Sequence, residues 1–235
     1  MAYFPLFVSL EGKRCLVVGG GKVAFRKAKA MAEYGAEVVV VAEKFCEEML
    51  ELLKEREEVG LEGKQIRGEG SACGEGMKRI KGVWRRAAVE DAEGMDLVLC
   101  ASSDEVFHHK MARYCQGKKI PVNVADNKKE SSFLFPALVR QGDLVIGITT
   151  GGNSPAASRY LREKIGNELF GAMGKLVEEL GKLRPLVKEK VQEPKIREEV
   201  FSRLFVWGLE RNGEIKEEDV WKVIEAMKKQ DESEY

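Results

Sequence analysis

Residues 14–27, RCLVVGGGKVAFRK, constrain the fold of this chain more than any other stretch. An apolar run at residues 15–18 is joined through three glycines to a helical pattern of apolar residues. Gly19, Gly21 and Ala24 have the spacing G-x-G-x-x-A. In that pattern the first glycine permits a tight turn, the second admits a pyrophosphate, and the small third residue lets helix and strand pack closely. The sequence therefore predicts a strand, a turn and a helix whose N-terminus faces the phosphates of a dinucleotide.

A second apolar run, residues 37–41, follows this helix, and Glu43 stands just past its end. A carboxylate at this distance from the glycines is placed to accept hydrogen bonds from the adenosine ribose, which favours NAD over NADP. Lys44 is its neighbour, so a 2′-phosphate is also compatible with the pattern. The alternative for Glu43 is a solvated residue that caps the next helix.

Further strand-like runs occur at residues 84–89, 96–101 and 121–126, separated by helical patterns. Such alternation predicts an α/β fold with a Rossmann-type parallel sheet. Ligands of these sheets bind outside the carboxyl ends of the strands. Ser102 and Ser103, which follow the run at 96–101, are therefore expected to face the same cofactor as the glycines.

Two apolar runs, residues 133–139 and 144–149, flank a Gly-Asp turn and predict a β-hairpin. A polar turn and a helix follow, with Ser154 as the N-cap and Pro155 at the first helical position. Hydroxyl and backbone N–H groups in this turn are suited to binding carboxylates or phosphate, and the residues concerned are Thr149, Thr150, Gly151, Asn153 and Ser154.

The remainder of the chain is charged and helical, with three apolar stripes. We therefore predict three parts, namely a cofactor-binding domain at 1–117, a small β-containing segment at 118–165 and a helical domain at 166–235. Residues 60–82 are rich in glycine and predict an irregular connection.

The sequence contains 39 basic and 39 acidic residues, so no net field favours nucleic acid or an anionic membrane. No apolar run approaches the ~20 residues that span a bilayer, and no signal peptide is evident at the N-terminus. Five cysteines without a C-x-x-C pair suit a reducing cytoplasm. His108 and His109 are adjacent and lack a third ligand, so we expect them at the surface and predict no metal site.

Several motifs together carry a family resemblance. PLF near the start, VVGGGKVAFRKA, NVAD followed by SFLFPALV, and ITTGGNSPAASRYLREKI have the order and spacing of the precorrin-2 dehydrogenase (siroheme synthase) family over roughly the first 165 residues. The resemblance implies NAD-dependent oxidation of precorrin-2 to sirohydrochlorin by a homodimer whose central segment is intertwined. Some members also insert ferrous iron, which would be a transient substrate here.

The resemblance also implies roles for individual residues. Asp126, which ends the strand at 121–126, matches the catalytic aspartate of the family, and Thr150 matches a serine that faces the tetrapyrrole. Cofactor contacts would fall on Gly19, Gly21, Lys22, Val23, Glu43, Lys44, Ser102 and Ser103. The chain departs from the family at Ser102 and Ser103, where Thr-Asp is usual, and at His108, where asparagine is usual.

Three functions are compatible with the sequence. The first is an NAD-dependent precorrin-2 dehydrogenase with Asp126 as general base, and the second adds sirohydrochlorin ferrochelatase activity at the same carboxylate. The third is a nucleotide-sensing regulatory module, which would also have a glycine turn but would need neither the hairpin nor the TTGGNSP turn. If Asp126 instead caps its own turn, its loss would affect stability only.

Overall fold

The computed structural model describes residues 3–61, 79–169 and 172–233. The chain forms two compact units, residues 1–135 and residues 136–235, and each is described by itself. The three-part division at 117 and 165 stays a prediction.

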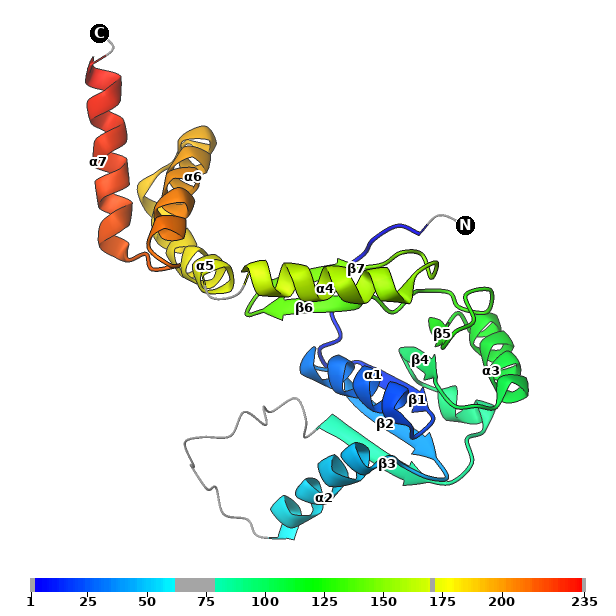
Figure 1. Cartoon of the computed structure of the whole chain (residues 1–235). Helices are drawn as coiled ribbons and strands as arrows, with labels where there is room; N and C mark the ends of the chain where they lie inside the picture. The colour runs from blue at the N-terminus through cyan, green and yellow to red at the C-terminus, as the bar shows by residue number, and fades with distance from the viewer. Residues whose placement is uncertain (1–2, 62–78, 170–171, 234–235) are drawn as a thin grey trace. The chain divides into compact units, whose positions relative to one another are not determined.

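The first unit contains a parallel five-stranded sheet in the order β3-β2-β1-β4-β5 (Figure 1). The strand order reverses between β1 and β4, and in sheets of this kind ligands bind at the carboxyl ends of the strands at that point. This sheet confirms the predicted α/β class. The strands are β1 (Arg14–Val18), β2 (Glu37–Ala42), β3 (Ile80–Trp84), β4 (Leu97–Cys100) and β5 (Val122–Val124).

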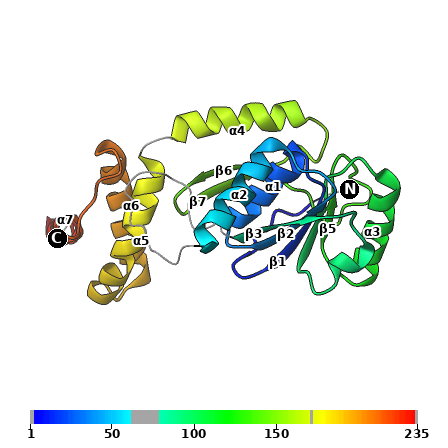
Figure 2. The ribbon, with the colours of Figure 1, turned by 90° about the horizontal axis from the view of Figure 1, so that it is seen from below.

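Helices cover both faces of this sheet. Side chains alternate between the two faces along each strand, so one strand can contribute to two cores. Cys15 and Val17 of β1 face the core beneath α1 (Lys22–Glu33) and α2 (Glu47–Leu61). Leu16 and Val18 face the opposite core, which packs against α3 (Glu105–Gly117); Figure 2 shows the sheet from a second direction. β1 is therefore buried on both sides, as its continuous apolar sequence predicts.

The strand expected at residues 84–89 lies earlier, at Ile80–Trp84. Gly82 made this stretch resemble a loop, but its lack of a side chain serves packing. A β-carbon there would lie 2.6 Å from Cδ1 of Leu53 on α2. The irregular connection predicted at 60–82 is therefore wrong at both ends, because residues 60–61 belong to α2 and residues 80–82 to β3. Its part at 62–78 lies outside the described residues.

The second unit begins with an antiparallel hairpin, β6 (Ala137–Gln141) and β7 (Leu144–Ile148), which confirms the predicted hairpin. Its first strand starts four residues later than expected. The carbonyl of Phe133 is not available to the hairpin, because it accepts a hydrogen bond from Asn123 Nδ2 at 3.0 Å. Pro136 has no N–H to donate to a neighbouring strand.

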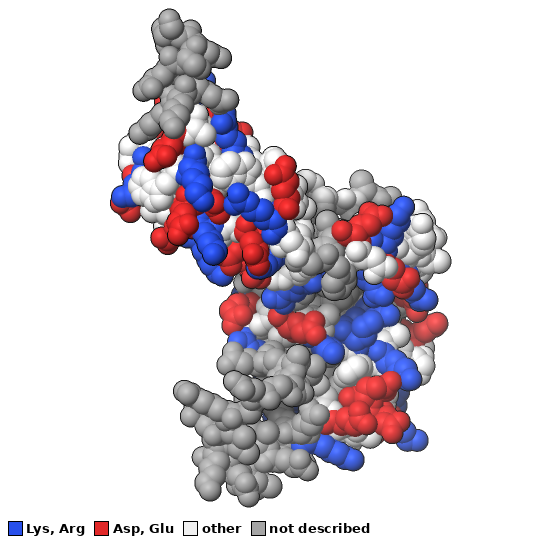
Figure 3. Space-filling model, turned by 60° about the vertical axis from the view of Figure 1, so that its left-hand side comes forward, with Lys and Arg blue, Asp and Glu red and all other residues white. Residues whose placement is uncertain are grey.

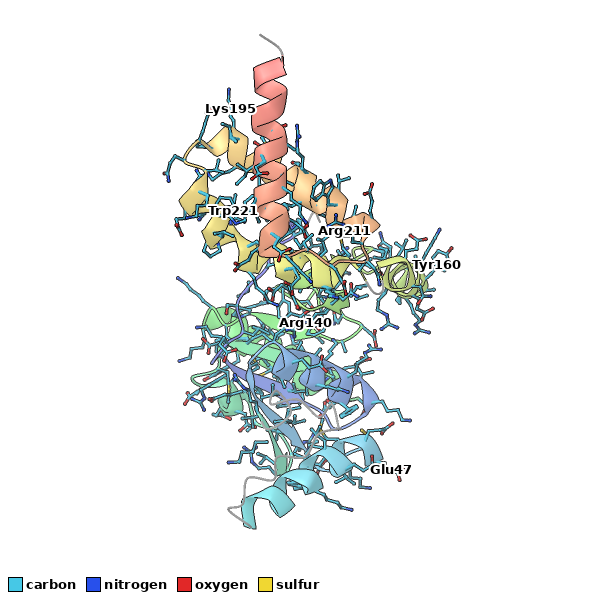
Figure 4. The ribbon with its side chains drawn as sticks, turned by 90° about the vertical axis from the view of Figure 1, so that its left-hand side faces the viewer. Glu47, Arg140, Tyr160, Lys195, Arg211 and Trp221 are labelled. Carbon is cyan, nitrogen blue, oxygen red and sulfur yellow. The ribbon has the colours of Figure 1, made fainter. Side chains whose placement is uncertain are left out.

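Four helices complete the second unit, namely α4 (Pro155–Leu169), α5 (Met173–Lys190), α6 (Pro194–Glu210) and α7 (Glu217–Ser233). The last three share a core that includes Leu176 and Leu204. Arg211, labelled in Figure 4 just past the end of α6, donates to the buried Asp219 of α7 at 3.0 Å. This contact connects the last two helices.

Acidic and basic side chains are interspersed on the face that Figure 3 presents, in keeping with their equal numbers, 39 of each. Among the residues that the structure describes, no helix is long and apolar enough to cross a membrane.

Candidate cofactor and active site

The glycine turn after β1 has a separate use for each glycine. At Gly19, where φ is +119°, a β-carbon would lie 2.5 Å from the carbonyl oxygen of Ala101. At Gly20 it would collide with the carbonyl oxygen of Lys44. At Gly21 it would meet nothing within 4 Å. The first two glycines thus let the turn pack against the loops after β4 and β2, and the third leaves open space in front of α1.

The N-terminus of α1 faces that space with Gly21 as its N-cap, and no side chain caps the helix. N–H groups of a first helical turn have no partner within their helix and attract anions. Lys22 is exposed, and its Nζ lies 3.1 Å from Oε1 of Glu48. Val23 is 44% exposed. The structure therefore places Gly19, Gly21, Lys22 and Val23 together, and their arrangement fits a pyrophosphate.

Glu43 and Lys44 are exposed at the carboxyl end of β2. α2 begins only at Glu47, so Glu43 is too far upstream to be its N-cap. The capping alternative for Glu43 is wrong, and its carboxylate is available to a ligand at the sheet edge.

Arg86 is a site residue that the sequence analysis missed. Its guanidinium donates to Asp104 Oδ2 at 2.8 Å. The hydrogen bond and charge of Asp104, together with the charge of Glu43, raise the pKa of Arg86. A guanidinium therefore lies within electrostatic reach of the carboxylate expected to bind the ribose. Arg86 stands two residues past the end of β3. Recognising it from the sequence required the correct position of that strand.

The loop after β4 contains Ser102 and Ser103, both exposed. Ser102 contacts the ring of His108, whose side chain is 4% exposed. The expected surface position of His108 is therefore wrong, because the first turn of α3 directs this histidine toward the loop. His109 is exposed as expected and pairs with Glu130.

Asp126 follows β5 and is exposed, with a φ of +58°. Asparagine and aspartate tolerate this left-handed conformation better than most residues. Among the residues that the structure describes, its carboxylate has no hydrogen bond or ion pair. The turn is instead closed by Ser131, whose hydroxyl donates to the carbonyl of Asn127 at 2.8 Å. Asp126 therefore does not cap its own turn.

Lys27 is a second residue that the sequence analysis missed. Its ammonium donates to Asn123 Oδ1 at 2.8 Å and lies 5.5 Å from the ring centroid of Phe135. Burial, and then the charge of Arg26, lower the pKa of Lys27, while the charge of Asp126 opposes this shift. Lys27 follows Ala24 by three positions and so lies on the buried face of α1. A lysine at such a position indicates a buried polar partner, and the sequence contained that signal.

The polar turn before α4 belongs to the second unit. Ser154 is the N-cap as predicted, because Ala157 N–H donates to its hydroxyl at 3.2 Å. The Thr150 hydroxyl accepts from Ser154 N–H at 3.1 Å and donates to Ser154 O at 3.0 Å. Gly151 N–H donates to the Thr149 hydroxyl at 3.1 Å. Thr150 thus holds the turn together, and contact of the turn with a substrate stays a prediction.

No group of three or more His, Cys, Asp or Glu residues in the described ranges could hold a metal ion. The groups at the sheet edge include the backbone N–H groups of the glycine turn, the carboxylates of Glu43 and Asp126, and the hydrogen-bonded cations of Arg86 and Lys27.

Comparison with known families agrees with this geometry. A family model described as "Putative NAD(P)-binding" matches residues 6–137, which include the whole sheet and the loops at its carboxyl edge. The chain belongs to this NAD(P)-binding family. The matched region includes the glycine turn with its open Gly21 and uncapped helix.

Curated relatives extend the similarity beyond that region. The siroheme synthase of Nitrosospira multiformis is 30% identical over 206 residues, which cover 87% of this chain and 39% of the relative. The siroheme synthase of Neisseria meningitidis is 30% identical over 239 residues, or 100% of this chain and 44% of the relative. The chain thus spans less than half the length of these relatives.

A solved structure titled SirC, precorrin-2 dehydrogenase, has the same fold. The TM-score is 0.66 at 19% sequence identity, and the match covers 97% of this chain and 100% of the other. The likeness includes the helical C-terminal region as well as the sheet.

Proposed function

We propose that this protein oxidises precorrin-2 to sirohydrochlorin with NAD⁺ as the hydride acceptor. The observation that carries the proposal is the free carboxylate of Asp126 at the sheet edge that holds the glycine turn. The names of the siroheme synthase relatives and of the precorrin-2 dehydrogenase with the same fold support the choice of substrate.

The pyrophosphate of the cofactor would lie against Gly21 and the first-turn N–H groups of α1, where the fold leaves space and uncapped donors. Glu43 would accept hydrogen bonds from the adenosine ribose, which excludes a 2′-phosphate by charge and supports NAD⁺. Lys44, Ser102 and Ser103 would complete the walls of the site. A bound nicotinamide supplies the hydride acceptor.

Asp126 would accept the proton that leaves the substrate as the hydride is removed. Its carboxylate has no competing partner among the described residues, so its lone pairs are available. The positive charge of Lys27 lies within electrostatic reach of this carboxylate.

Precorrin-2 carries carboxylate side chains, which require hydrogen-bond donors. The turn formed by Thr149, Thr150, Gly151, Asn153 and Ser154 would contribute backbone N–H groups to them, with φ values of +64° and +81° at Gly151 and Gly152 shaping it. We propose that the protein acts as a homodimer through its hairpin segment. We place the reaction in the cytoplasm, because the four cysteines in the described ranges are free thiols.

An anaerobic assay tests this function. Precorrin-2 and NAD⁺ are incubated with the protein, and NADH absorbance is followed together with the sirohydrochlorin spectrum. The two products should appear in equal amounts. A folded protein that binds NAD⁺ but forms neither product would overturn the proposal and favour a nucleotide-sensing module.

A second activity, insertion of ferrous iron into sirohydrochlorin, is favoured by the name that the curated relatives share. Fe²⁺ added to the product of the first assay tests it. Siroheme should form faster with the protein than without it, and equal rates would exclude this activity.

A further inference from the structure

The ring of His108 contacts one residue twice, through the same nitrogen. Ser102 N–H donates to Nε2 at 3.3 Å, and the Ser102 hydroxyl oxygen lies 2.7 Å from the same nitrogen. Asp104 N–H donates to that hydroxyl oxygen at 3.4 Å. The backbone N–H of His108 donates to the backbone carbonyl of Asp104 at 2.9 Å. The loop after β4 and the first turn of α3 are thus closed into one hydrogen-bonded ring.

The contact from the backbone N–H of Ser102 favours one tautomer of the neutral His108 ring. A ring nitrogen that accepts from a backbone N–H cannot carry a hydrogen itself, so Nε2 is bare and the hydrogen of the neutral imidazole is on Nδ1. Burial lowers the pKa of His108, which also favours the neutral ring.

The charged groups around His108 have the opposite effect. Asp104 and Glu105 belong to the start of α3, and Glu130 comes from the loop after β5; all three favour a protonated ring. Arg86 reduces the influence of Asp104 by pairing with it. Burial is nevertheless the largest of these effects, so the ring stays neutral at neutral pH.

The loop that His108 holds is also the loop that touches the glycine turn. A β-carbon at Gly19 would lie 2.5 Å from Ala101 O and 2.8 Å from Ser102 N. Ala101 N–H donates to Val18 O at 2.7 Å, so the loop is fixed to β1 on one side. His108 fixes its other side through the Ser102 N–H.

We propose that neutral His108 is a positioning residue for the nicotinamide cofactor, holding Ser102 through Nε2 so that the loop after β4 keeps its place against Gly19. The inference rests on cofactor binding at the glycine turn. Protonation of the ring puts a hydrogen on Nε2, so the Ser102 N–H loses its acceptor while the Ser102 hydroxyl, 2.7 Å away, accepts from the ring instead. The backbone of the loop then loses one of the bonds that hold it. Cofactor affinity is therefore controlled by the titration of a residue that does not touch the cofactor.

Isothermal titration of the full chain with NAD⁺ between pH 5 and pH 8 tests this coupling. The wild type should bind about tenfold more weakly once His108 is protonated, because the hydrogen bond from the Ser102 N–H to Nε2 is then lost. Because burial lowers the pKa of His108, the decrease should be centred below pH 6.5, the ordinary histidine value.

Three variants separate this titration from others. His108→Gln offers an amide oxygen that accepts from Ser102 at every pH, so its affinity should lose this pH dependence. His109→Gln changes the neighbouring exposed histidine and should keep the wild-type profile. His108→Leu removes the acceptor and should bind weakly throughout the range. A His108→Gln profile identical to that of the wild type would overturn the proposal.

Nuclear magnetic resonance of the ligand-free protein gives an answer that does not require cofactor. The chain has two histidines, so the ¹⁵N signals of the rings are assigned by comparison with the His109→Gln variant. His108 should show a protonated Nδ1 and a bare Nε2 at pH 7. A hydrogen on Nε2 would overturn the role of His108, whereas a folded wild type that binds no NAD⁺ or NADP⁺ at any pH would overturn the cofactor site itself.

Discussion

The carbonyl oxygen of Ala101 lies 2.5 Å from the position that a β-carbon would occupy on Gly19. Two loops from neighbouring strands, β1 and β4, are therefore in direct backbone contact at the point where the strand order reverses. This contact shapes the cofactor site without contributing a functional group, and it gives the first prediction.

Gly19→Ala should weaken NAD⁺ binding by at least about tenfold, because the new methyl group displaces the Ala101 loop and φ at this position is +119°. Gly117→Ala is the matched control, since a β-carbon there meets nothing within 4 Å. Titration calorimetry measures both affinities, with circular dichroism to verify folding. Wild-type affinity in a folded Gly19→Ala protein would contradict the account of the turn.

Glu43→Gln should reduce the preference for NAD⁺ over NADP⁺ by about tenfold, because the lost charge both weakens the bonds to the ribose hydroxyls and removes repulsion of a 2′-phosphate. Glu47→Gln is the control, since Glu47 is exposed at the start of α2 (Figure 4). The ratio of the two dissociation constants is the quantity to measure. An equal ratio in Glu43→Gln and Glu47→Gln would place the ribose elsewhere.

Lys27→Met should lower turnover by about tenfold, because the Lys27 ammonium donates to Asn123 Oδ1 at 2.8 Å on the strand that leads to Asp126. Lys27→Arg keeps a donor and a positive charge and should retain more turnover than the methionine variant. Stopped-flow measurement of NADH formation gives both rates. If the methionine and arginine variants turn over equally, Lys27 acts only through packing.

Two helical glycines of the second unit should respond to alanine with opposite signs. Gly208→Ala on α6 should lower the free energy of unfolding by about 1–3 kcal/mol, because its β-carbon collides with the fully buried Leu176. Gly181→Ala on α5 should raise it by up to about 1 kcal/mol, since a β-carbon there meets nothing within 4 Å. Urea denaturation compares them, and equal changes would contradict the packing of α5 on α6.

The fold class, the glycine turn and the Ser154 cap were predictable because each depends on residues close in sequence. The helix N-terminus at Gly21 is an example, since the turn and the helix it opens are one continuous stretch. β3 was misplaced because Gly82 is explained only by Leu53, a residue of a different element.

The candidate site was also predictable only where its residues lie next to an element that the sequence reveals. The loops that contain Glu43 and Ser102 could be located because each comes directly after a strand. The apolar runs in the sequence show where those strands end. Lys27 and His108 were missed or misjudged because their partners, Asn123 and the Ser102 N–H, are determined by how α1 and α3 pack on the sheet. A polar residue on a buried helical face indicates such a partner but not its identity.

The central claim is that Asp126 is the general base of precorrin-2 oxidation. The most direct test compares Asp126→Asn with the wild type under anaerobic conditions, measuring NADH and sirohydrochlorin formation and, separately, the dissociation constant for NAD⁺. Asp143→Asn, which neutralises an exposed carboxylate of the hairpin turn, is the control. The account predicts a turnover about 10²- to 10⁴-fold lower in Asp126→Asn with NAD⁺ affinity retained. Turnover equal to that of the wild type would contradict it.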